Sequence, residues 1–143
     1  MSDSVFVHEH RVRYQETDQM GVVYHANYLN WFEVGRTEWI RAAGMPYAEL
    51  ERRGLLLPVT ELNIQYASPA RYDELVNVRV ELTEFSAVRL KFDYEARRST
   101  DGVLLVSGWS RHVWVNATWR PARIDREAPE LYRLVASRFS EKG

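Results

Sequence analysis

The stretch ETDQMGVVYHANYLNWFEVGR (residues 16–36) places one carboxylate, Asp18, among small and aromatic residues and then runs directly into a helical pattern. Over residues 27–43 the apolar positions recur with the spacing of one helix face. These positions are Tyr28, Trp31, Phe32, Gly35, Trp39, Ile40 and Ala43. The pattern predicts a long helix with a wide apolar face, which the rest of the chain has to cover.

Both ends of this helix are marked in the sequence. Asn27 is the expected N-cap, because a short polar side chain can accept a hydrogen bond from the free backbone N–H groups of the first turn. Gly44 followed by Pro46 supplies the expected stop. Residues 45–54, MPYAELERRG, then predict a short second helical turn.

Alternation of apolar and polar residues indicates strands on both sides of the helical segment. Residues 5–14 alternate roughly, and residues 74–85 show the cleanest pattern in the chain. The other expected strands are residues 55–66, 89–98 and 103–115, with a hairpin turn at Asp101–Gly102 and an amphipathic closing segment over residues 129–139. Short links between the last three strands predict an antiparallel meander.

Length and composition fit one globular domain, residues 1–143. A chain of 143 residues is long enough for one sizeable core but not for two. Its 45% hydrophobic and 27% charged residues are far from the composition of disordered chains. We therefore expect an α+β fold in which one long central helix is wrapped by an antiparallel sheet of about five strands.

Charge, cysteine content and the first residues exclude several classes of protein. A formal net charge of -1 provides no overall basic field for nucleic acid. The absence of cysteine excludes disulfides, thiolate metal sites and a cysteine nucleophile. No leader pattern and no run of about 18 apolar residues occurs, so we expect no transmembrane segment and a cytoplasmic protein.

Asp18 is the first candidate for chemistry. An aspartate in a loop before a helix is ordinarily a turn former or a solvated carboxylate. Here Gly21 permits close backbone approach, and free N–H groups around Tyr24 to Ala26 would point out of the helix start, where partial positive charge accumulates. Such a turn can hold an oxyanion while the carboxylate acts as general base or nucleophile. Together these groups suit hydrolytic acyl transfer.

The remaining polar residues leave their roles open. His25 could be an acid, a substrate contact or a residue packed near the helix start, and Tyr14 is more often a core or rim aromatic than a catalyst. Arginines of this kind are ordinarily solvated surface charges. If clustered in space, they would suit a phosphate-bearing ligand; the candidates are Arg71, Arg89, Arg120 and Arg123.

Metal and serine chemistry lack support in the sequence. His8 and His10 point to one face of an expected strand, but a zinc site needs at least three protein ligands, so we expect no metal. Ser107 and Ser110 do not form a GxSxG elbow. No P-loop and no GxGxxG motif occurs, so we expect no nucleotide cofactor.

The segment RVRYQETDQMGVVYHANYLNWFE, followed by LNIQYASPARYDELV and the strands to WVN, closely resembles a known enzyme family. The family is the hotdog-fold acyl-CoA thioesterases of the 4-hydroxybenzoyl-CoA thioesterase type, in the branch of small bacterial enzymes associated with the Tol-Pal system. The resemblance covers roughly residues 5–130. It implies a long helix wrapped by a curved antiparallel sheet, with Asp18 as the catalytic carboxylate.

The resemblance also implies further site residues and an assembly. Backbone amides of Tyr24 and His25 would polarise the thioester carbonyl, with supporting catalytic roles for Tyr14 and His25. The coenzyme A nucleotide would lie against basic residues, for which the candidates are Arg89, Arg120 and Arg123. Family members form homodimers with joined sheets and active sites at the subunit interface, often paired again into homotetramers. No metal or redox cofactor is required.

The expected function is therefore hydrolysis of a short-chain or aromatic acyl-CoA to free acid and CoA. The enzymatic rival is a hotdog hydratase or dehydratase, which would abstract a proton next to the carbonyl. The sequence is also compatible with a non-catalytic acyl-CoA binding or regulatory module and with a protein that acts chiefly through partners. Tyr28, Trp31 and Trp39 could line an acyl tunnel or could be core.

Overall fold

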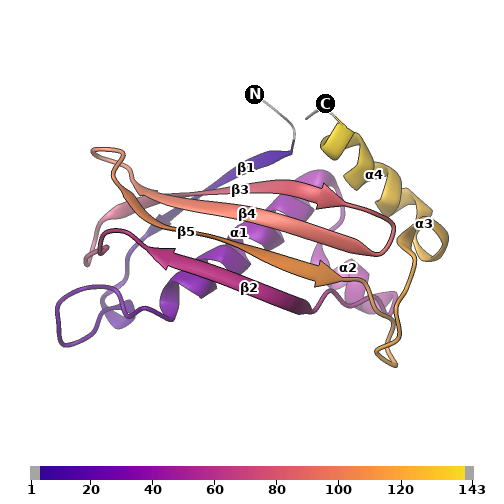
Figure 1. The fold of residues 1–143 in the computed structure, drawn as a ribbon, viewed down its shortest axis with the longest axis horizontal. Helices are drawn as coiled ribbons and strands as arrows, with labels where there is room; N and C mark the ends of the chain where they lie inside the picture. The colour runs from indigo at the N-terminus through magenta and orange to yellow at the C-terminus, as the bar shows by residue number, and fades with distance from the viewer. Residues whose placement is uncertain (1–3, 141–143) are drawn as a thin grey trace.

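A five-stranded antiparallel sheet packs against helix α1 (Asn27–Ala43) in the computed structural model, which describes residues 4–140. Figure 1 shows α1 lying across one face of the sheet. The strand order is β1-β3-β4-β5-β2. The strands are β1 (Val5–Arg11), β2 (Val59–Tyr66), β3 (Leu75–Phe85), β4 (Arg89–Arg98) and β5 (Leu104–Val113). The expected α+β architecture of one long helix against about five antiparallel strands is confirmed.

Four shorter elements complete the fold. They are the 3-10 turn η1 (Tyr14–Glu16) and the helices α2 (Tyr47–Arg52), α3 (Ile124–Glu127) and α4 (Pro129–Ser140). The expected helical turn after α1 and the closing amphipathic helix are confirmed, whereas α3 was not expected. Within residues 4–140, no helix is long and apolar enough to cross a membrane.

Several boundaries differ from the sequence expectation; for example, β5 ends at Val113 and not at residue 115, and three further differences are as follows. The first strand ends at Arg11 and not at residue 14, because its partner β3 begins at Leu75, opposite Arg11. The second strand, β2, begins at Val59 and not at residue 55, because Pro58 has no backbone N–H to donate to a neighbouring strand. The N-cap of α1 is Ala26, with helical backbone angles, in place of the expected Asn27.

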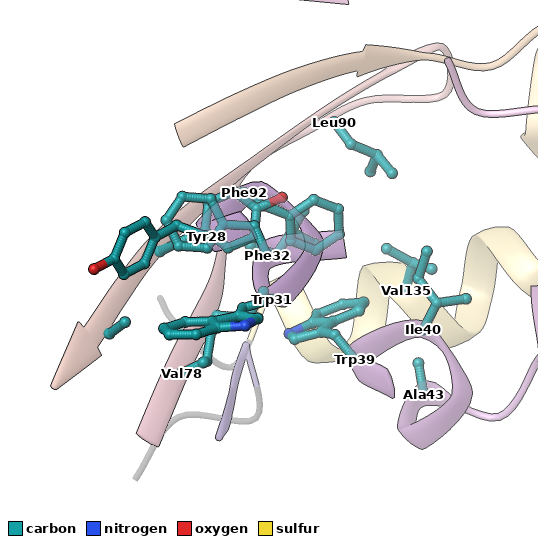
Figure 2. Packing of buried hydrophobic residues seen from close by; sticks show 14 of the residues in the cluster. Tyr28, Trp31, Phe32, Trp39, Ile40, Ala43, Val78, Leu90, Phe92 and Val135 are labelled. Carbon is teal, nitrogen blue, oxygen red and sulfur yellow. The ribbon is translucent and has the colours of Figure 1, made fainter. Parts of the chain in front are cut away.

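The apolar face of α1 forms the core with the inner face of the sheet. Trp31 and Trp39 are each 2% exposed and are therefore core residues. Phe32 stacks on Tyr94 of β4, with ring centroids 4.3 Å apart and planes 7° from parallel. Figure 2 shows these aromatic rings gathered between helix and sheet. Burial of this aromatic layer fixes the position of α1 and therefore of the loop that precedes it.

Gly35 allows α1 to approach the sheet closely. A Cβ atom at this position would lie 2.7 Å from Cγ2 of Val80 on β3. Real Cβ atoms do not approach other carbons so closely, so a side chain here would push the helix from the sheet or displace Val80. The glycine that the sequence placed on the apolar face is thus the contact point between helix and sheet.

Strand β2 is an edge strand with an incompletely covered inner face. It pairs with β5 on one side only. The side chains of Val59, Leu62 and Tyr66 are 47%, 48% and 50% exposed. Leu62 shares a small cavity with Leu29 and Phe32 of α1, so it points toward the helix side of the sheet. Helix α1 therefore leaves the inner face of β2 partly open.

We expect Gly35→Ala to lower the free energy of unfolding. Overpacking of a core contact costs typically about 1–3 kcal/mol, which exceeds the roughly 0.5–1 kcal/mol that alanine gains over glycine in a helix. Urea unfolding of the wild type, Gly35→Ala, Val80→Ala and the double variant would measure the effect. The double variant should be more stable than the sum of the single effects predicts. A Gly35→Ala protein as stable as the wild type would contradict the close contact.

Candidate active site

The loop between η1 and α1 and the end of β2 enclose a pocket of about 270 Å³. The loop contributes Asp18 and His25, and the end of β2 with the residues after it contributes Tyr66 and Ser68. Tyr28 of α1 forms part of the wall as well as part of the core. The structure thus brings two of the expected site residues together, and we call this cavity the Asp18 pocket.

A tight turn holds the carboxylate of Asp18 in place. The Asp18 amide donates to the carbonyl of Val22, and the amide of Gly21 donates to the carbonyl of Asp18, both at 2.9 Å. Gly21 has φ of 80°, a conformation that favours glycine. The amide of Met20 donates to Oδ1 of Asp18 at 2.9 Å. Among residues 4–140 no donor contacts Oδ2, which leaves this oxygen available to a substrate or to water.

Two backbone amides at the start of α1 are free. Within the part of the chain that the structure describes, the N–H groups of His25 and Ala26 donate to no acceptor. The Tyr24 amide, which was expected to share this role, donates instead to the carbonyl of Glu16 at 2.9 Å, because the loop folds back on η1. Partial positive charge accumulates at a helix start, so the two free amides suit an oxyanion. Ala26 therefore replaces Tyr24 as a candidate donor.

Tyr66 is a site residue that the sequence did not identify. Its phenol O–H donates to the carbonyl of His25 at 3.0 Å. The Tyr66 ring also meets the edge of the Tyr28 ring, with centroids 5.6 Å apart. These contacts tie the end of β2 to the residue whose amide is free. The only signal in the sequence was that Tyr66 lies within the second family-like segment.

Tyr14 lies outside the Asp18 pocket. It opens η1, is 77% exposed and meets the ring of Tyr72 edge to face, with centroids 5.8 Å apart. The sequence placed Tyr14 at the end of a strand, but the strand has already ended at Arg11. Of the three side chains expected to be catalytic, Asp18 and His25 share a pocket and Tyr14 does not.

Glu16 anchors the loop and was also missed by the sequence analysis. Its side chain is buried, with the residue only 4% exposed. Its carboxylate accepts hydrogen bonds from the Arg13 amide at 2.8 Å, the Trp31 indole N–H at 2.9 Å and His10 Nε2 at 2.9 Å. Its carbonyl accepts from the Asn27 side chain at 2.8 Å. One residue thus joins β1, η1 and α1 at the start of the loop that carries Asp18.

The environment of Glu16 favours its ionised form. Burial raises the pKa of Glu16, but the hydrogen bonds from Arg13, Trp31 and His10 outweigh burial and hold the pKa below its ordinary value. The group is therefore a charged structural anchor at neutral pH. Its stabilising effect is present above the ordinary carboxyl pKa and is lost as the pH falls through the lowered one.

His8 and His10 do not form a metal centre with a third side chain. Their ring centroids are 6.5 Å apart, and His10 lies against Trp31 at 4.9 Å. In residues 4–140, no group of three or more histidine, aspartate or glutamate side chains is placed to hold a metal ion. His10 instead binds Glu16 and supports the loop.

The arginines expected to bind CoA lie at the opposite end of the sheet from the Asp18 pocket. Arg89 opens β4 opposite Val113, the last residue of β5, whereas the pocket adjoins the start of β5 through Ala67. Arg120 and Arg123 follow β5, and Arg123 is paired with Asp125. Arg89 and Arg120 form no ion pair with any described residue. Within one chain, these residues are not part of the Asp18 pocket.

Comparisons with known proteins agree with this arrangement. The family model described as the thioesterase-like superfamily matches residues 12–135. YneP of Bacillus subtilis, whose assignment as an acyl-CoA thioesterase is provisional, is 37% identical over 87% of this chain and 90% of its own. The acyl-CoA thioesterase YbgC of Haemophilus influenzae is 38% identical over 70% of this chain and 74% of its own.

A solved structure matches even more of the chain. The DHNA-CoA thioesterase from Staphylococcus aureus is 35% identical and superposes with a TM-score of 0.89. The match covers 93% of this chain and 89% of the Staphylococcus aureus chain. The helix and five strands described above are therefore the hotdog fold that the resemblance implied.

We expect Glu16→Gln to lower the free energy of unfolding at pH 7 by about 1–3 kcal/mol, because buried donors lose a charged acceptor. The difference from the wild type should shrink as the pH falls below about 4.5, since the Glu16 carboxylate then protonates first in the unfolded chain and, at lower pH, in the folded protein. Urea unfolding between pH 7 and pH 3.5 would measure both effects. Glu9→Gln, at an exposed position on β1, is the matched control. A difference that does not change with pH would contradict the anchoring role of the charge.

Proposed function

This chain belongs to the thioesterase-like superfamily and is a thioester hydrolase, and from this premise we propose that it hydrolyses acyl-CoA to a free acid and CoA. The observation that carries the proposal is the Asp18 pocket, which Asp18 and His25 both line and where Oδ2 of Asp18 accepts no hydrogen bond from residues 4–140. The free amides of His25 and Ala26 complete the set of groups that acyl transfer needs.

The proposed reaction uses the carboxylate and the helix start together. The thioester carbonyl oxygen accepts hydrogen bonds from the amides of His25 and Ala26, which stabilise the negative charge that develops during attack. Asp18 either removes a proton from the attacking water or attacks the carbonyl itself. The C–S bond then breaks, and CoA leaves as a thiolate that takes up a proton. If water attacked, the acid is released directly; if Asp18 attacked, a water molecule first hydrolyses the acyl anhydride formed on Asp18, which releases the acid and restores the carboxylate. A thiolate is a good leaving group, so no serine or cysteine nucleophile is needed.

The side chains of His25 and Tyr14 receive lesser roles. The His25 imidazole lies at the pocket and packs against Tyr24, with ring centroids 4.5 Å apart, so it is placed to contact the substrate or the leaving group. Tyr14 is exposed beside the loop and would act at the rim. We assign neither of them the primary chemical step.

We further propose that the enzyme is a homodimer joined through β2. An open strand edge with exposed apolar side chains is ordinarily covered in natural proteins. Antiparallel pairing of β2 with the same strand of a second copy follows a two-fold axis and is self-complementary. It would join the two sheets and cover Leu62 and Tyr66, which α1 leaves exposed. Pairing of two such dimers into a tetramer is compatible with this arrangement.

The dimer gives the distant arginines a role. In antiparallel pairing, the Val59 end of one β2 meets the Tyr66 end of the other. Arg89 and Arg120 lie beyond the Val59 end, because Val59 pairs with His112 near the end of β5. The partner's Asp18 pocket would then adjoin these two guanidinium groups, which are free to bind CoA phosphates. Arg123, already paired with Asp125, is the weaker candidate.

The substrate is proposed to be a short-chain or aromatic acyl-CoA. The Asp18 pocket, at about 270 Å³, suits a thioester group and a small part of the acyl chain. The Staphylococcus aureus enzyme is named for an aromatic acyl-CoA, and the Haemophilus influenzae enzyme for acyl-CoA in general. A hydratase would act on an enoyl-CoA without releasing CoA, and a binding module would retain acyl-CoA without turnover.

We expect Asp18→Asn to lower kcat/KM for acyl-CoA hydrolysis at least about a hundredfold, because the variant keeps the size of the side chain and loses the base or nucleophile. Release of the CoA thiol from short, long and aromatic acyl-CoAs would measure it. Asp73→Asn, at an exposed loop position outside the pocket, is the matched control. Acyl-CoA bound without turnover by the wild type would overturn the hydrolase proposal in favour of a binding module.

We expect Leu62→Glu to convert the dimer to a monomer, since it would place two carboxylates near the two-fold axis of the joined sheet. Light scattering after size-exclusion chromatography would measure the mass, and circular dichroism would establish that the monomer is folded. Hydrolysis should fall with dimer content, because each site uses both chains. Val7→Glu, a similarly exposed apolar position on the opposite edge strand, should leave the dimer intact. A wild-type monomer with full activity would contradict the shared site.

A further inference from the structure

Arg36 lies at a second and larger cavity, of about 490 Å³, on the helix side of the molecule. Residues of α1, α2 and the segment that leads into β2 line it, with Trp119 after β5; they include Arg36, Glu33, Tyr47, Leu57 and Pro58. Because Leu57 and Pro58 directly precede β2, this cavity lies at the opposite end of β2 from the Asp18 pocket. We call it the Arg36 cavity.

The Arg36 guanidinium has hydrogen-bond partners but no carboxylate partner. Its Nη1 donates to the phenol oxygen of Tyr94 at 3.1 Å, and the phenol of Tyr47 is a second partner. Within residues 4–140 it forms no ion pair, although the exposed residues Glu33 and Glu51 lie at the same cavity. Among the same residues, its buried Nε finds no acceptor. A partly buried cation without an anion is unfavourable unless a ligand supplies one.

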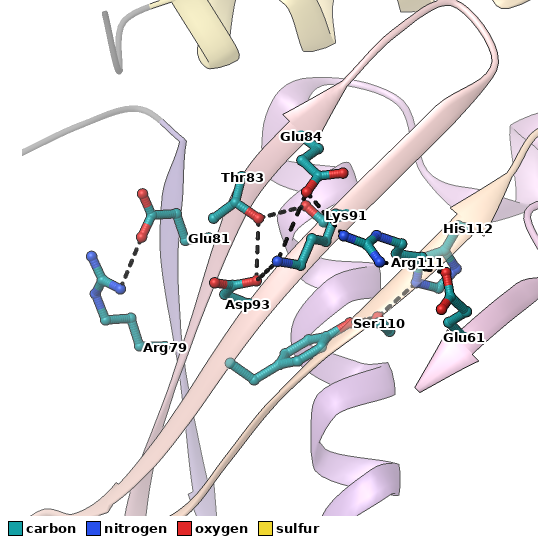
Figure 3. Close-up of polar contacts among 11 residues, drawn as sticks. Glu61, Arg79, Glu81, Thr83, Glu84, Lys91, Asp93, Ser110, Arg111 and His112 are labelled. Atoms are coloured by element: carbon teal, nitrogen blue, oxygen red, sulfur yellow. Dashed lines mark hydrogen bonds and ion pairs between the residues drawn. The ribbon is translucent and has the colours of Figure 1, made fainter. Parts of the chain in front are cut away.

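Tyr94, which accepts from Arg36, begins a series of hydrogen bonds that runs on to Ser110 and His112. The direction of these bonds follows from the last of them. His112 Nδ1 contacts the carbonyl of Leu57 at 3.4 Å and has to donate to it, so Nε2 accepts from Ser110, 2.7 Å away. Ser110 in turn accepts from the phenol of Tyr94 at 2.5 Å. Figure 3 shows Ser110 and His112 joined in this chain on β5. Each hydrogen of these bonds is therefore directed away from Arg36, and the oxygen of Tyr94 is the atom that accepts from the guanidinium.

The hydrogen-bonded side chains next to Arg36 are also electrically neutral. Burial, and secondarily the positive charge of Arg36, lower the pKa of His112 to about 4, so the imidazole is uncharged at neutral pH. Burial raises the pKa of the Tyr47 phenol, which stays protonated despite the nearby guanidinium. Neither group provides a negative charge for Arg36. The cavity thus presents the positive charge of Arg36, for which neither His112 nor Tyr47 supplies an anion.

We propose that Arg36 binds an oxygen acceptor at the distal end of the acyl group, so that the enzyme prefers acyl-CoAs with a terminal carboxylate or a ring hydroxyl to plain alkyl or aryl ones. A planar guanidinium matches a carboxylate or a phenolic oxygen in geometry and in charge. A plain alkyl chain in the same cavity would leave the N–H groups without an acceptor. The inference deepens the proposed thioesterase function and rests on it.

The Asp18 pocket and the Arg36 cavity can bind the same substrate molecule only if they come from two chains of a dimer. Strand β2 has eight residues and spans about 26 Å at about 3.3 Å per residue, too far for a short acyl group to reach from Asp18 to Arg36 of the same chain. In the dimer proposed above, antiparallel pairing brings the Arg36 cavity of one chain beside the Asp18 pocket of the other. The thioester would then be cleaved by one chain while the other binds the end of the acyl group.

The test compares substrates that differ only at the distal end. CoA release would be measured with adipoyl-CoA against hexanoyl-CoA and with 4-hydroxybenzoyl-CoA against benzoyl-CoA. We expect the wild type to favour at least one oxygen-bearing member at least about tenfold in kcat/KM, because a site built to hydrogen-bond a substrate group discriminates against analogues that lack it. The two pairs distinguish a carboxylate from a phenol as the preferred group. Equal rates within both pairs would overturn the proposal.

Variants then assign the preference to Arg36. Arg36→Met should abolish the preference while retaining hydrolysis of hexanoyl-CoA, and Arg36→Lys should retain part of the preference for adipoyl-CoA. Arg41→Met, at an exposed position on the same helix, is the matched control. A Met variant that hydrolyses all four substrates equally poorly would mean a structural role and overturn the proposal. Thermal unfolding establishes whether each variant folds. If Arg36→Met does not fold, the substrate preference of Arg36→Lys tests the proposal.

A binding measurement separates this inference from the thioesterase proposal. Calorimetric titration of the Asp18→Asn protein with adipoyl-CoA and hexanoyl-CoA needs no turnover. Tighter binding of adipoyl-CoA, lost when Arg36→Met is added, would support the inference even if the wild type hydrolyses neither compound. The inference about Arg36 would be rejected if Asp18→Asn bound the two compounds equally while the wild type hydrolysed only hexanoyl-CoA. The thioesterase proposal would remain intact.

Discussion

The close packing of α1 on the sheet is the constraint on which the rest of the molecule depends. Gly35 lets the helix approach Val80, and the aromatic face on either side fills the space between helix and strands. With the helix fixed in this way, the residues just before its first turn, which include His25 of the Asp18 pocket, are held in place, and its middle places Arg36 at the second cavity. One element therefore supplies the core and two polar sites, and none of these can shift without the others.

Sequence periodicity could predict the elements but not the contacts between them. The apolar spacing of residues 27–43 and the alternation of residues 74–85 depend only on which face is buried, so both elements lie where the pattern indicated. Asp18 and His25, which line one pocket, could be proposed as candidates because a carboxylate before a helix start is a local feature. Glu16 could not, since its three partners come from separate elements. The expectation that the Tyr24 amide would polarise the substrate carbonyl was wrong, because this amide donates to the carbonyl of Glu16 in the preceding turn.

The environment of Arg36 could not be predicted from the sequence either. In the sequence it is one charged residue on a helix, where a solvated guanidinium is the ordinary expectation. Its environment arises from Tyr94 on β4 and Tyr47 on α2, neither of which is close to it in the chain. The separation of the Asp18 pocket from the arginines after β5 likewise depends on the pairing of the strands, because the pocket adjoins the start of β5 and these arginines follow its end. These features become visible only when strands far apart in the sequence are placed side by side.

The carboxylate of Glu16 also bears on the order in which the chain can fold. Its partners are His10 on β1, the Arg13 amide in the adjoining turn and the indole of Trp31 on α1. Two of these lie on opposite sides of the loop, so the full set exists only after strand and helix have docked. Until then the turn that carries Asp18 lacks its support and samples many conformations. The loop that carries Asp18 therefore gains this support only once strand and helix are in place, and a chain in which they have not docked lacks the contacts that hold the Asp18 pocket together.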